Sequence, residues 1–229
     1  MKLAIMQPYF FPYIGYWQLI NAVDSYVIYD DVAYIKGGWI NRNNFLIGGE
    51  KKLYTIKLRE ARSGRPINEI ELLDDFVKFK KMLPINYSRA PFLNAVMELI
   101  SEITSFQSAN LAGFLENSIR LISSYLNINT NIILSSSMKK NNALKGKNKV
   151  LHICELMGAT KYYNAIGGVE LYDKSEFSNK GIELMFLKAN LQPYTQGKNE
   201  FTPGLSIIDV MMYNSIEVIQ EMLDDYELT

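Results

Sequence analysis

The stretch that decides the fold is Leu3–Val32, LAIMQPYFFPYIGYWQLINAVDSYVIYDDV. Its first apolar run, Leu3–Met6, predicts a short buried strand that ends before Pro8. An apolar stripe within Trp17–Val23 predicts a helix, and Tyr26–Tyr29 predicts a second strand. Strand, helix and strand in this order form a βαβ unit, whose two strands are parallel. The stretch therefore predicts an α/β protein: a Rossmann-like, mainly parallel sheet with helices on both faces and a helical insertion.

Polar and aromatic side chains follow both strands of this unit. Ligands of such sheets bind at the carboxyl ends of the strands, so we expect the site at that edge. Asp30 and Asp31 end the second strand, and because neighbouring side chains of an extended chain point to opposite sides, only one can face a cleft. The expected catalytic residues are Asp31 as the base, Asp30 and Tyr16. The expected substrate contacts at this edge are Gln7, Tyr9 and Tyr13.

A polar cluster at 36–44 precedes a predicted β-hairpin. Phe45–Ile47 and Leu53–Leu58 are strand-like, and Gly48 and Gly49 lie between them. The cluster combines a cation, an aromatic ring, an arginine fork and several amides, which suits a phosphorylated or sugar-containing ligand. The alternative is an ordinary polar loop that caps the hairpin. The ligand contacts expected here are Lys36, Trp39, Asn41, Arg42 and Asn43.

The middle of the chain predicts a helical block at about 74–126. Apolar spacing predicts one helix before Tyr87, a second at Phe92–Ile103 and a third at Leu111–Leu126. No linker rich in proline, glycine or serine separates the block from its neighbours. We therefore expect a single domain over 1–229, in which the block covers the sheet.

Three later segments add candidate contacts. The serines after a strand at 132–134 stand before two lysines, which suits a phosphate, although serines at such a position are also common helix caps. Two glycines follow a strand at 161–165, where they would let a ligand approach the backbone. A later loop offers amide and phenol groups. The residues concerned are Ser135, Ser136, Ser137, Gly167, Gly168, Gln192, Tyr194 and Gln196.

Composition excludes several classes of protein. The 24 Lys and Arg balance the 24 Asp and Glu, so no basic field points to nucleic acid. A single cysteine excludes an internal disulfide framework and fits a reducing compartment. Met1 leads straight into a strand without a signal peptide, and no apolar run approaches the about 20 residues that span a bilayer. We expect a cytoplasmic protein without membrane insertion, and a homo-oligomer stays possible.

Standard catalytic and metal-binding signatures are absent from the sequence. It has no Walker loop, no G-x-G-x-x-G, no G-x-S-x-G and no metal-type spacing of Cys and His. We therefore predict no metal, and the cofactor stays unknown. His152 and Cys154 lie two residues apart on a predicted helix, so they point in different directions and are not expected to form a nucleophilic pair.

Tyr13-Ile14-Gly15-Tyr16 occupies the place where nucleotidyltransferases of the HIGH superfamily carry His-x-Gly-His, after the first strand and at the start of a helix. Both histidines are tyrosines here. The serine turn with its trailing lysines lies where such enzymes carry a second motif. This analogy rests on the positions of the two motifs in the fold, and it suggests an ATP-dependent ligase as one alternative function.

Taken in order, these motifs resemble the WbqC-like protein family over nearly the whole chain. QPYFFPYIGYWQLI resembles the start of the family pattern, and Asp30-Asp31-Val32 with the 36–43 cluster resembles its second block. Gln192–Gln196 and Leu205–Asp209 continue the match. The chain departs from the pattern in the helix before Tyr87, where Phe76 and Phe79 replace a tryptophan and a histidine. A step that depends on that histidine is missing here or supplied otherwise.

The resemblance implies a role in bacterial O-antigen, and hence lipopolysaccharide, or other surface-polysaccharide biosynthesis. It leaves the reaction open. With the residues above, it favours a transferase that attaches an acyl or aminoacyl group to a nucleotide-linked amino sugar. The alternatives are a non-catalytic protein that binds sugar nucleotides in the assembly machinery and an ATP-dependent amide ligase of the HIGH type.

Overall fold

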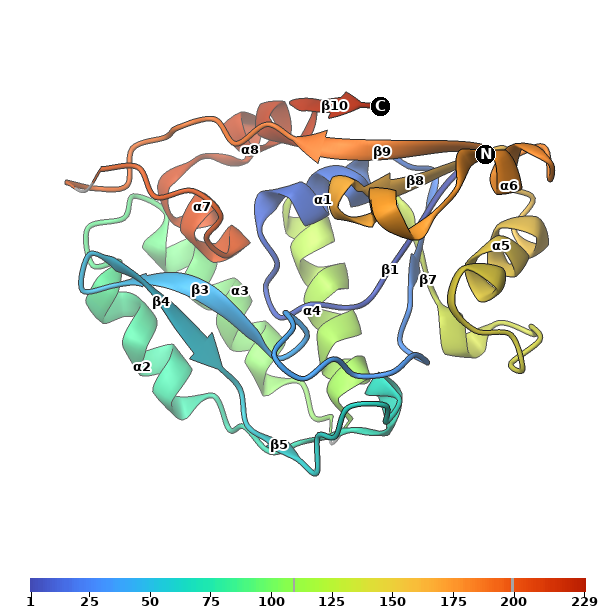
Figure 1. Cartoon of the computed structure of the whole chain (residues 1–229). Helices are drawn as coiled ribbons and strands as arrows, with labels where there is room; N and C mark the ends of the chain where they lie inside the picture. The colour runs from blue at the N-terminus through green and yellow to red at the C-terminus, as the bar shows by residue number, and fades with distance from the viewer. Residues whose placement is uncertain (109, 199) are drawn as a thin grey trace.

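The computed structural model describes residues 1–108, 110–198 and 200–229. Its centre is a six-stranded sheet built from β1 (Lys2–Met6), β2 (Ser25–Ile28), β7 (Asn131–Leu134), β8 (Lys161–Ala165), β9 (Glu183–Ala189) and β10 (Tyr226–Leu228). The strands lie in the order β10-β9-β8-β1-β2-β7 (Figure 1). Those from β9 to β7 are parallel, whereas β10 is antiparallel to β9. The predicted Rossmann-like α/β fold is confirmed.

The βαβ unit predicted from Leu3–Val32 forms the middle of this sheet. Helix α1 (Ile14–Asn21) joins β1 to β2, which pair in register from Leu3 opposite Ser25 to Met6 opposite Ile28. Burial explains the helix: the Trp17 side chain is fully buried, and its indole Nε1 donates to the Pro12 carbonyl at 3.0 Å. A hydrophobic residue packed in this way stabilises a short helix more than its intrinsic propensity does.

Side chains alternate along β1, so the sheet contributes to two cores. Leu3 and Ile5 pack with residues of α5 (Gly146–Leu156) and α6 (Lys174–Ser178). Ala4 belongs to the larger core on the other face, with residues of α1, α7 (Ile207–Tyr213) and α8 (Ile216–Leu223). Figure 1 shows α5 and α6 on one side of the sheet and α1 and α8 away from them. Helices thus cover both faces.

A long insertion separates β2 from β7. It contains the hairpin β3 (Arg42–Ile47) and β4 (Glu50–Thr55), the short pair β5 (Leu58–Arg59) and β6 (Glu71–Leu72), and the helices α2 (Val77–Asn86), α3 (Leu93–Ser105) and α4 (Leu111–Tyr125). Single 3-10 turns are η1 (Ile67–Glu69), η2 (Ser135–Ser137) and η3 (Ile166–Leu171). The buried residues of the insertion share one continuous core with the sheet. None of the helices in the described ranges has the length and apolar character needed to cross a membrane.

Phe79 lies in an aromatic cluster within this core. Its ring centroid is 5.5 Å from that of Phe10, 5.6 Å from that of Phe11 and 5.4 Å from that of Phe45, and the Phe79 side chain is fully buried. Phe76 stacks on another ring, at a centroid distance of 4.7 Å. At the two positions where this chain departs from the family pattern, the side chains therefore serve packing.

The strand order places a topological switch point at β1. The chain moves from β1 to β2 on one side, and after β7 it crosses to β8 on the other side of β1. Parallel sheets bind ligands beside such a switch point, at the carboxyl ends of the strands. Gln7 follows β1 and Ile166 follows β8 at this edge.

Candidate functional site

The turn at 7–13 carries the chain from β1 to α1 along this edge. Phe11 has a left-handed φ of 43°, which a bulky side chain rarely adopts. Three hydrogen bonds hold this conformation. Asn43 Nδ2 donates to the carbonyl oxygens of Phe10 and Phe11 at 3.0 and 2.7 Å, and Ser206 Oγ donates to the Phe11 oxygen at 2.8 Å. Groups distant in sequence thus stabilise one shape of the turn, which is common at functional sites.

Tyr13 and Tyr16 have opposite surroundings. The Tyr13 ring lies over the first turn of α1, where a Cβ on Gly15 would come within 2.5 Å of its Cε2 atom. Tyr13 remains 36% exposed. Tyr16 is buried, its hydroxyl donates to the Gln7 carbonyl at 3.0 Å, and burial raises its pKa far above the usual value. Tyr13 therefore faces a ligand-accessible surface, whereas Tyr16 supports the turn.

An open pocket, here called the aromatic hollow, lies in front of the turn. Trp39 is 46% exposed in it, and the Trp39 carbonyl accepts a hydrogen bond from Phe10 N at 3.1 Å. Exposed rings in a pocket provide stacking surfaces for a sugar or a base. The residues around the hollow are Tyr9, Pro12, Tyr13, Trp39, Asn43 and Gly204.

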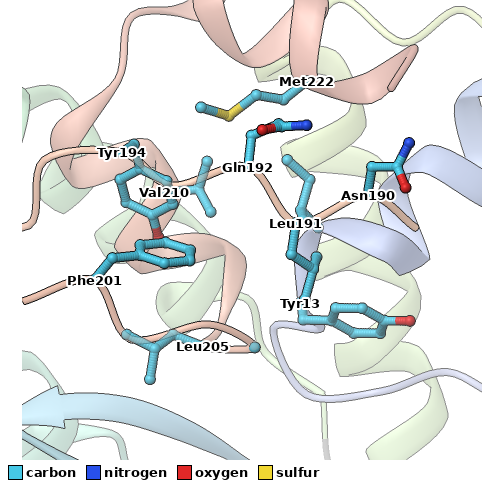
Figure 2. A pocket seen from close by; sticks show the side chains of 11 residues that line it. Tyr13, Asn190, Leu191, Gln192, Tyr194, Phe201, Leu205, Val210 and Met222 are labelled. Carbon is cyan, nitrogen blue, oxygen red and sulfur yellow. The ribbon is translucent and has the colours of Figure 1, made fainter. Parts of the chain in front are cut away.

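A second, shallow pocket, here called the apolar slot, opens beside the aromatic hollow. Both pockets include Tyr13 and Gly204 in their walls, so they form parts of one groove. Figure 2 shows the slot from close by. Its walls include Tyr13, Leu191, Gln192, Phe201, Val210 and Met222.

A buried ionic cluster lies farther along the same edge, after β2 and β7. Asp31 Oδ2 contacts Lys140 Nζ at 2.8 Å and Lys149 Nζ at 3.0 Å, while Asp31 Oδ1 accepts from Ser135 Oγ at 2.7 Å. The side chains of Lys140 and Lys149 are only 1% and 8% exposed. Asp30 is also buried and accepts from Ser136 N at 2.9 Å. The cluster therefore contains two aspartates and two lysines.

This environment decides what the Asp31 carboxylate can do. Burial would raise its pKa, but hydrogen bonds from Lys140, Ser135 and Lys149 outweigh burial and hold the pKa below its usual value. A general base works best when its pKa lies near the working pH. Asp31 thus pairs with two lysines, and its predicted role as the base gains no support from this geometry.

A second buried carboxylate, Asp209 on α7, accepts hydrogen bonds from neutral donors. Its Oδ1 accepts from Tyr194 Oη at 2.7 Å and from Gln196 Nε2 at 2.7 Å, and its Oδ2 accepts from Tyr87 Oη at 3.0 Å. Burial raises the pKa of Asp209, and these hydrogen bonds offset only part of the effect. Asp209 thereby connects α7 to the end of α2 and to the loop that forms one wall of the apolar slot.

The polar cluster at 36–44 divides into exposed and internal groups. Lys36 and Trp39 are exposed. Asn41 and Asn43 are buried, and Asn41 accepts from Tyr34 Oη at 2.8 Å. Arg42 donates from Nε to the Gly38 carbonyl at 3.0 Å and from Nη2 to that of Gly37. Arg42 therefore braces the turn that presents Trp39.

The remaining predicted contacts occupy different surroundings. Gly167 and Gly168 lie in η3, where Gly168 packs so closely on Asn164 that a Cβ would come within 2.6 Å of its Nδ2. Ser137 Oγ donates to a backbone carbonyl, and Gln7 Nε2 donates to the Ala33 carbonyl at 3.4 Å. Many of the expected residues thus gather in two places, the groove at the switch point and the Asp31 cluster, whereas Gly167 and Gly168 line neither.

Lys149 and Asp209 are participants that the sequence predictions missed. Lys149 precedes the buried Ile153 by four residues, so helical spacing alone places it on the apolar face of α5. Asp209 lies in the first turn of α7, which Ser206 caps by accepting a hydrogen bond from Ile208 N at its Oγ atom. The adjacent apolar residues of α7, all buried, were the signal that this helix lies inside the core.

Other titratable groups offer no further centre. In the described ranges, no three side chains of His, Cys, Asp and Glu lie together as a metal ion would require. Cys154 is buried against β-strands, and burial raises the pKa of its thiol to about 12, which disfavours the nucleophilic thiolate.

Comparisons with known proteins identify the family to which this chain belongs. A protein of Mycobacterium tuberculosis, described as uncharacterized protein Rv1507c, is 28% identical over 216 residues, which cover 92% of each chain. No solved structure matches the chain. The profile of the WbqC-like protein family matches residues 7–221, which include the Asp31 cluster and the groove except for Met222. The chain therefore belongs to the WbqC-like protein family.

Proposed function

We propose that the protein is a cytoplasmic transferase of bacterial surface-polysaccharide biosynthesis, such as that of O-antigen, which acylates the amine of a nucleotide-linked sugar. The observation that carries this proposal is the groove at the switch point. Trp39 and Tyr13 are exposed there, and buried hydrogen bonds hold the turn behind them. Aromatic side chains of this kind stack on sugars and bases.

Binding of a nucleotide-linked sugar makes use of the charges beside the hollow. Lys36 is exposed on the segment that carries Trp39. Arg42 has its Nε and Nη2 atoms bonded to the turn, which leaves Nη1 without a partner among the described residues. A guanidinium and an ammonium group complement a diphosphate. The sugar or the base would then stack in the aromatic hollow.

The proposed reaction requires no metal and no protein nucleophile. The free amine of the sugar attacks the carbonyl carbon of an acyl thioester, a C–N bond forms, and the C–S bond breaks. The proton that the nitrogen loses ends on the leaving sulfur, so the products are an amide and a thiol. Positioning the two reactants accounts for most of the acceleration in such a step.

A direct test combines the protein with nucleotide-linked amino sugars and acyl thioesters. Mass spectrometry of the products should show the mass of one acyl group added to one sugar. Binding without any product would favour the alternative of a non-catalytic binding or scaffold protein. The HIGH-type ligase alternative would instead release pyrophosphate from ATP in the presence of a carboxylate.

Tryptophan fluorescence should report binding in the aromatic hollow. The chain has two tryptophans, of which Trp17 is fully buried and Trp39 is 46% exposed. A bound nucleotide-linked sugar is expected to change the Trp39 emission and shield it from acrylamide. Trp39→Ala should weaken binding by about 1–3 kcal/mol through lost stacking. The matched variants are Trp39→Phe, which should abolish the signal, and Trp17→Phe, which should keep it. Binding that leaves Trp39 equally open to acrylamide would place the ligand elsewhere.

Gly15→Ala should separate binding from stability. The added methyl group displaces the Tyr13 ring from the first turn of α1, because the two would lie within 2.5 Å. Alanine is favoured over glycine in a helix by about 0.5–1 kcal/mol, so the unfolding temperature should hold or rise. Affinity for the nucleotide-linked sugar should fall by about tenfold, equal to about 1.4 kcal/mol. Unchanged affinity, measured by calorimetry, would remove Tyr13 from the binding surface.

A further inference from the structure

We propose that the apolar slot binds the acyl group of the donor, and that it selects an uncharged acyl group over an aminoacyl group. This inference rests on the proposed transferase function for its choice of ligand. Continuity of the two pockets supports it. Tyr13 and Gly204 line both the slot and the aromatic hollow, so a ligand in the slot lies next to a sugar stacked beside Trp39.

The lining of the slot is mostly apolar. Leu191, Val210 and Met222 form aliphatic walls, and the rings of Phe201 and Tyr194 lie at a centroid distance of 5.2 Å, inclined by 70° (Figure 2). A hydrocarbon chain in such a site loses contact with water and gains contact with carbon, which favours binding. This surface suits a short acyl chain.

Two of the polar groups around the slot already have partners. The Tyr194 hydroxyl donates to Asp209 Oδ1 at 2.7 Å, and Asn190 Nδ2 donates to Asp225 Oδ1 at 2.9 Å. The Gln192 amide has no hydrogen-bond partner among the described residues. Figure 2 shows this amide beside Met222. It can donate to a carbonyl oxygen of the ligand, and a single amide suits an ester or amide carbonyl better than a charge.

The charges around the slot decide between the two kinds of acyl group. None of the described lining residues is acidic. Two carboxylates lie behind the lining. Asp209 accepts a hydrogen bond from Tyr194, and Asp225 accepts one from Asn190. The ammonium group of an aminoacyl ligand would therefore lose water in the slot without gaining a carboxylate, which is unfavourable. An uncharged acyl group meets no such penalty.

A pair of nearly isosteric amides tests this selectivity. Isobutyramide and alaninamide differ by a methyl group in place of an ammonium group, and alaninamide is charged at a pH of about 6, because an α-amino group has a pKa of about 8. Saturation-transfer NMR on the full chain should detect isobutyramide and should show at least about tenfold weaker binding of alaninamide, equal to about 1.4 kcal/mol. Equal or tighter binding of alaninamide would overturn the proposed selectivity.

Two matched variants place the ligand in the slot. Leu191→Phe adds bulk to the wall and should abolish the isobutyramide signal, whereas Leu171→Phe, at a 67% exposed position in η3, should not change it. No signal with wild-type protein, or a signal that survives Leu191→Phe, would overturn the assignment of the slot. The acrylamide experiment on Trp39 separately measures whether the nucleotide-linked sugar binds in the aromatic hollow. Failure there with an intact amide signal would reject the proposed function and keep the apolar site.

Discussion

Asp31→Ala is expected to lower the free energy of unfolding by about 3–5 kcal/mol, the range for removing one partner of a buried ion pair. The reason is that Lys140 and Lys149, at 1% and 8% exposure, would keep their charges without a carboxylate. Urea unfolding at neutral pH measures the effect. Glu183→Ala is the control, because its bridge to Lys161 is exposed and solvent screens it, so its loss should change stability little. Equal losses in both variants would mean that the cluster does not stabilise the fold.

The same cluster affects any test of Asp31 as a catalytic base. Asp31→Asn removes the charge that both lysines share, so lost turnover could reflect an altered fold. The double variant Asp31→Asn/Lys140→Met removes one charge of each sign and should recover part of the lost stability. A double-mutant cycle measures this coupling. Turnover measured in the more stable double variant then addresses the chemistry of Asp31 itself.

Asp209→Ala should lower the free energy of unfolding by about 2–5 kcal/mol, since each buried donor left without an acceptor costs about 1–3 kcal/mol. The hydroxyl groups of Tyr87 and Tyr194 would lose their acceptor, whereas Gln196 Nε2 would keep the Thr202 carbonyl. Tyr194→Phe removes one donor and should cost only about 1 kcal/mol. A loss from Asp209→Ala no larger than that from Tyr194→Phe would show that the three hydrogen bonds do not act through Asp209.

The raised pKa of Asp209 has a definite consequence for stability at different pH values. The folded protein binds this proton more tightly than the unfolded chain, so wild-type protein should gain stability relative to Asp209→Asn as the pH falls. The gain begins at the folded-state pKa and is complete below the unfolded value of about 3.9. Urea unfolding of both proteins at several pH values measures the difference. Asp31 has the opposite sign, because its folded-state pKa is lowered.

The sequence predicted the fold because its period-2 and period-3.6 patterns agree with the turns between them. It also predicted that side chains after different parallel strands would share one edge. Asp31 and Ser135 meet at 2.7 Å although they are 104 residues apart. The pattern could not show that the Asp31 carboxylate pairs with Lys140 and Lys149. The lysines come from a turn and a helix whose positions depend on packing against the completed sheet.

The polar cluster at 36–44 shows a different limit of prediction from sequence. Asn43 and Arg42 have the chemistry of ligand contacts, yet both bond to backbone carbonyls of nearby turns. The demand for these donors comes from the conformation of Phe11 and of the Gly37–Gly38 turn, which no local pattern reveals. Trp39 differs, because it is exposed in the hollow. Residue type alone could not separate these groups.

The insertion between β2 and β7 also sets the order in which the chain can assemble during synthesis. Ser25 and Asn131 face each other in the finished sheet but lie 106 residues apart. At a translation rate of about 5–20 residues per second, the free edge of β2 waits for roughly 5–20 s until its partner emerges. Hydrophobic strands with open edges invite pairing with other chains. The first βαβ unit therefore has an unpaired, hydrophobic strand edge while the ribosome completes the chain as far as β7.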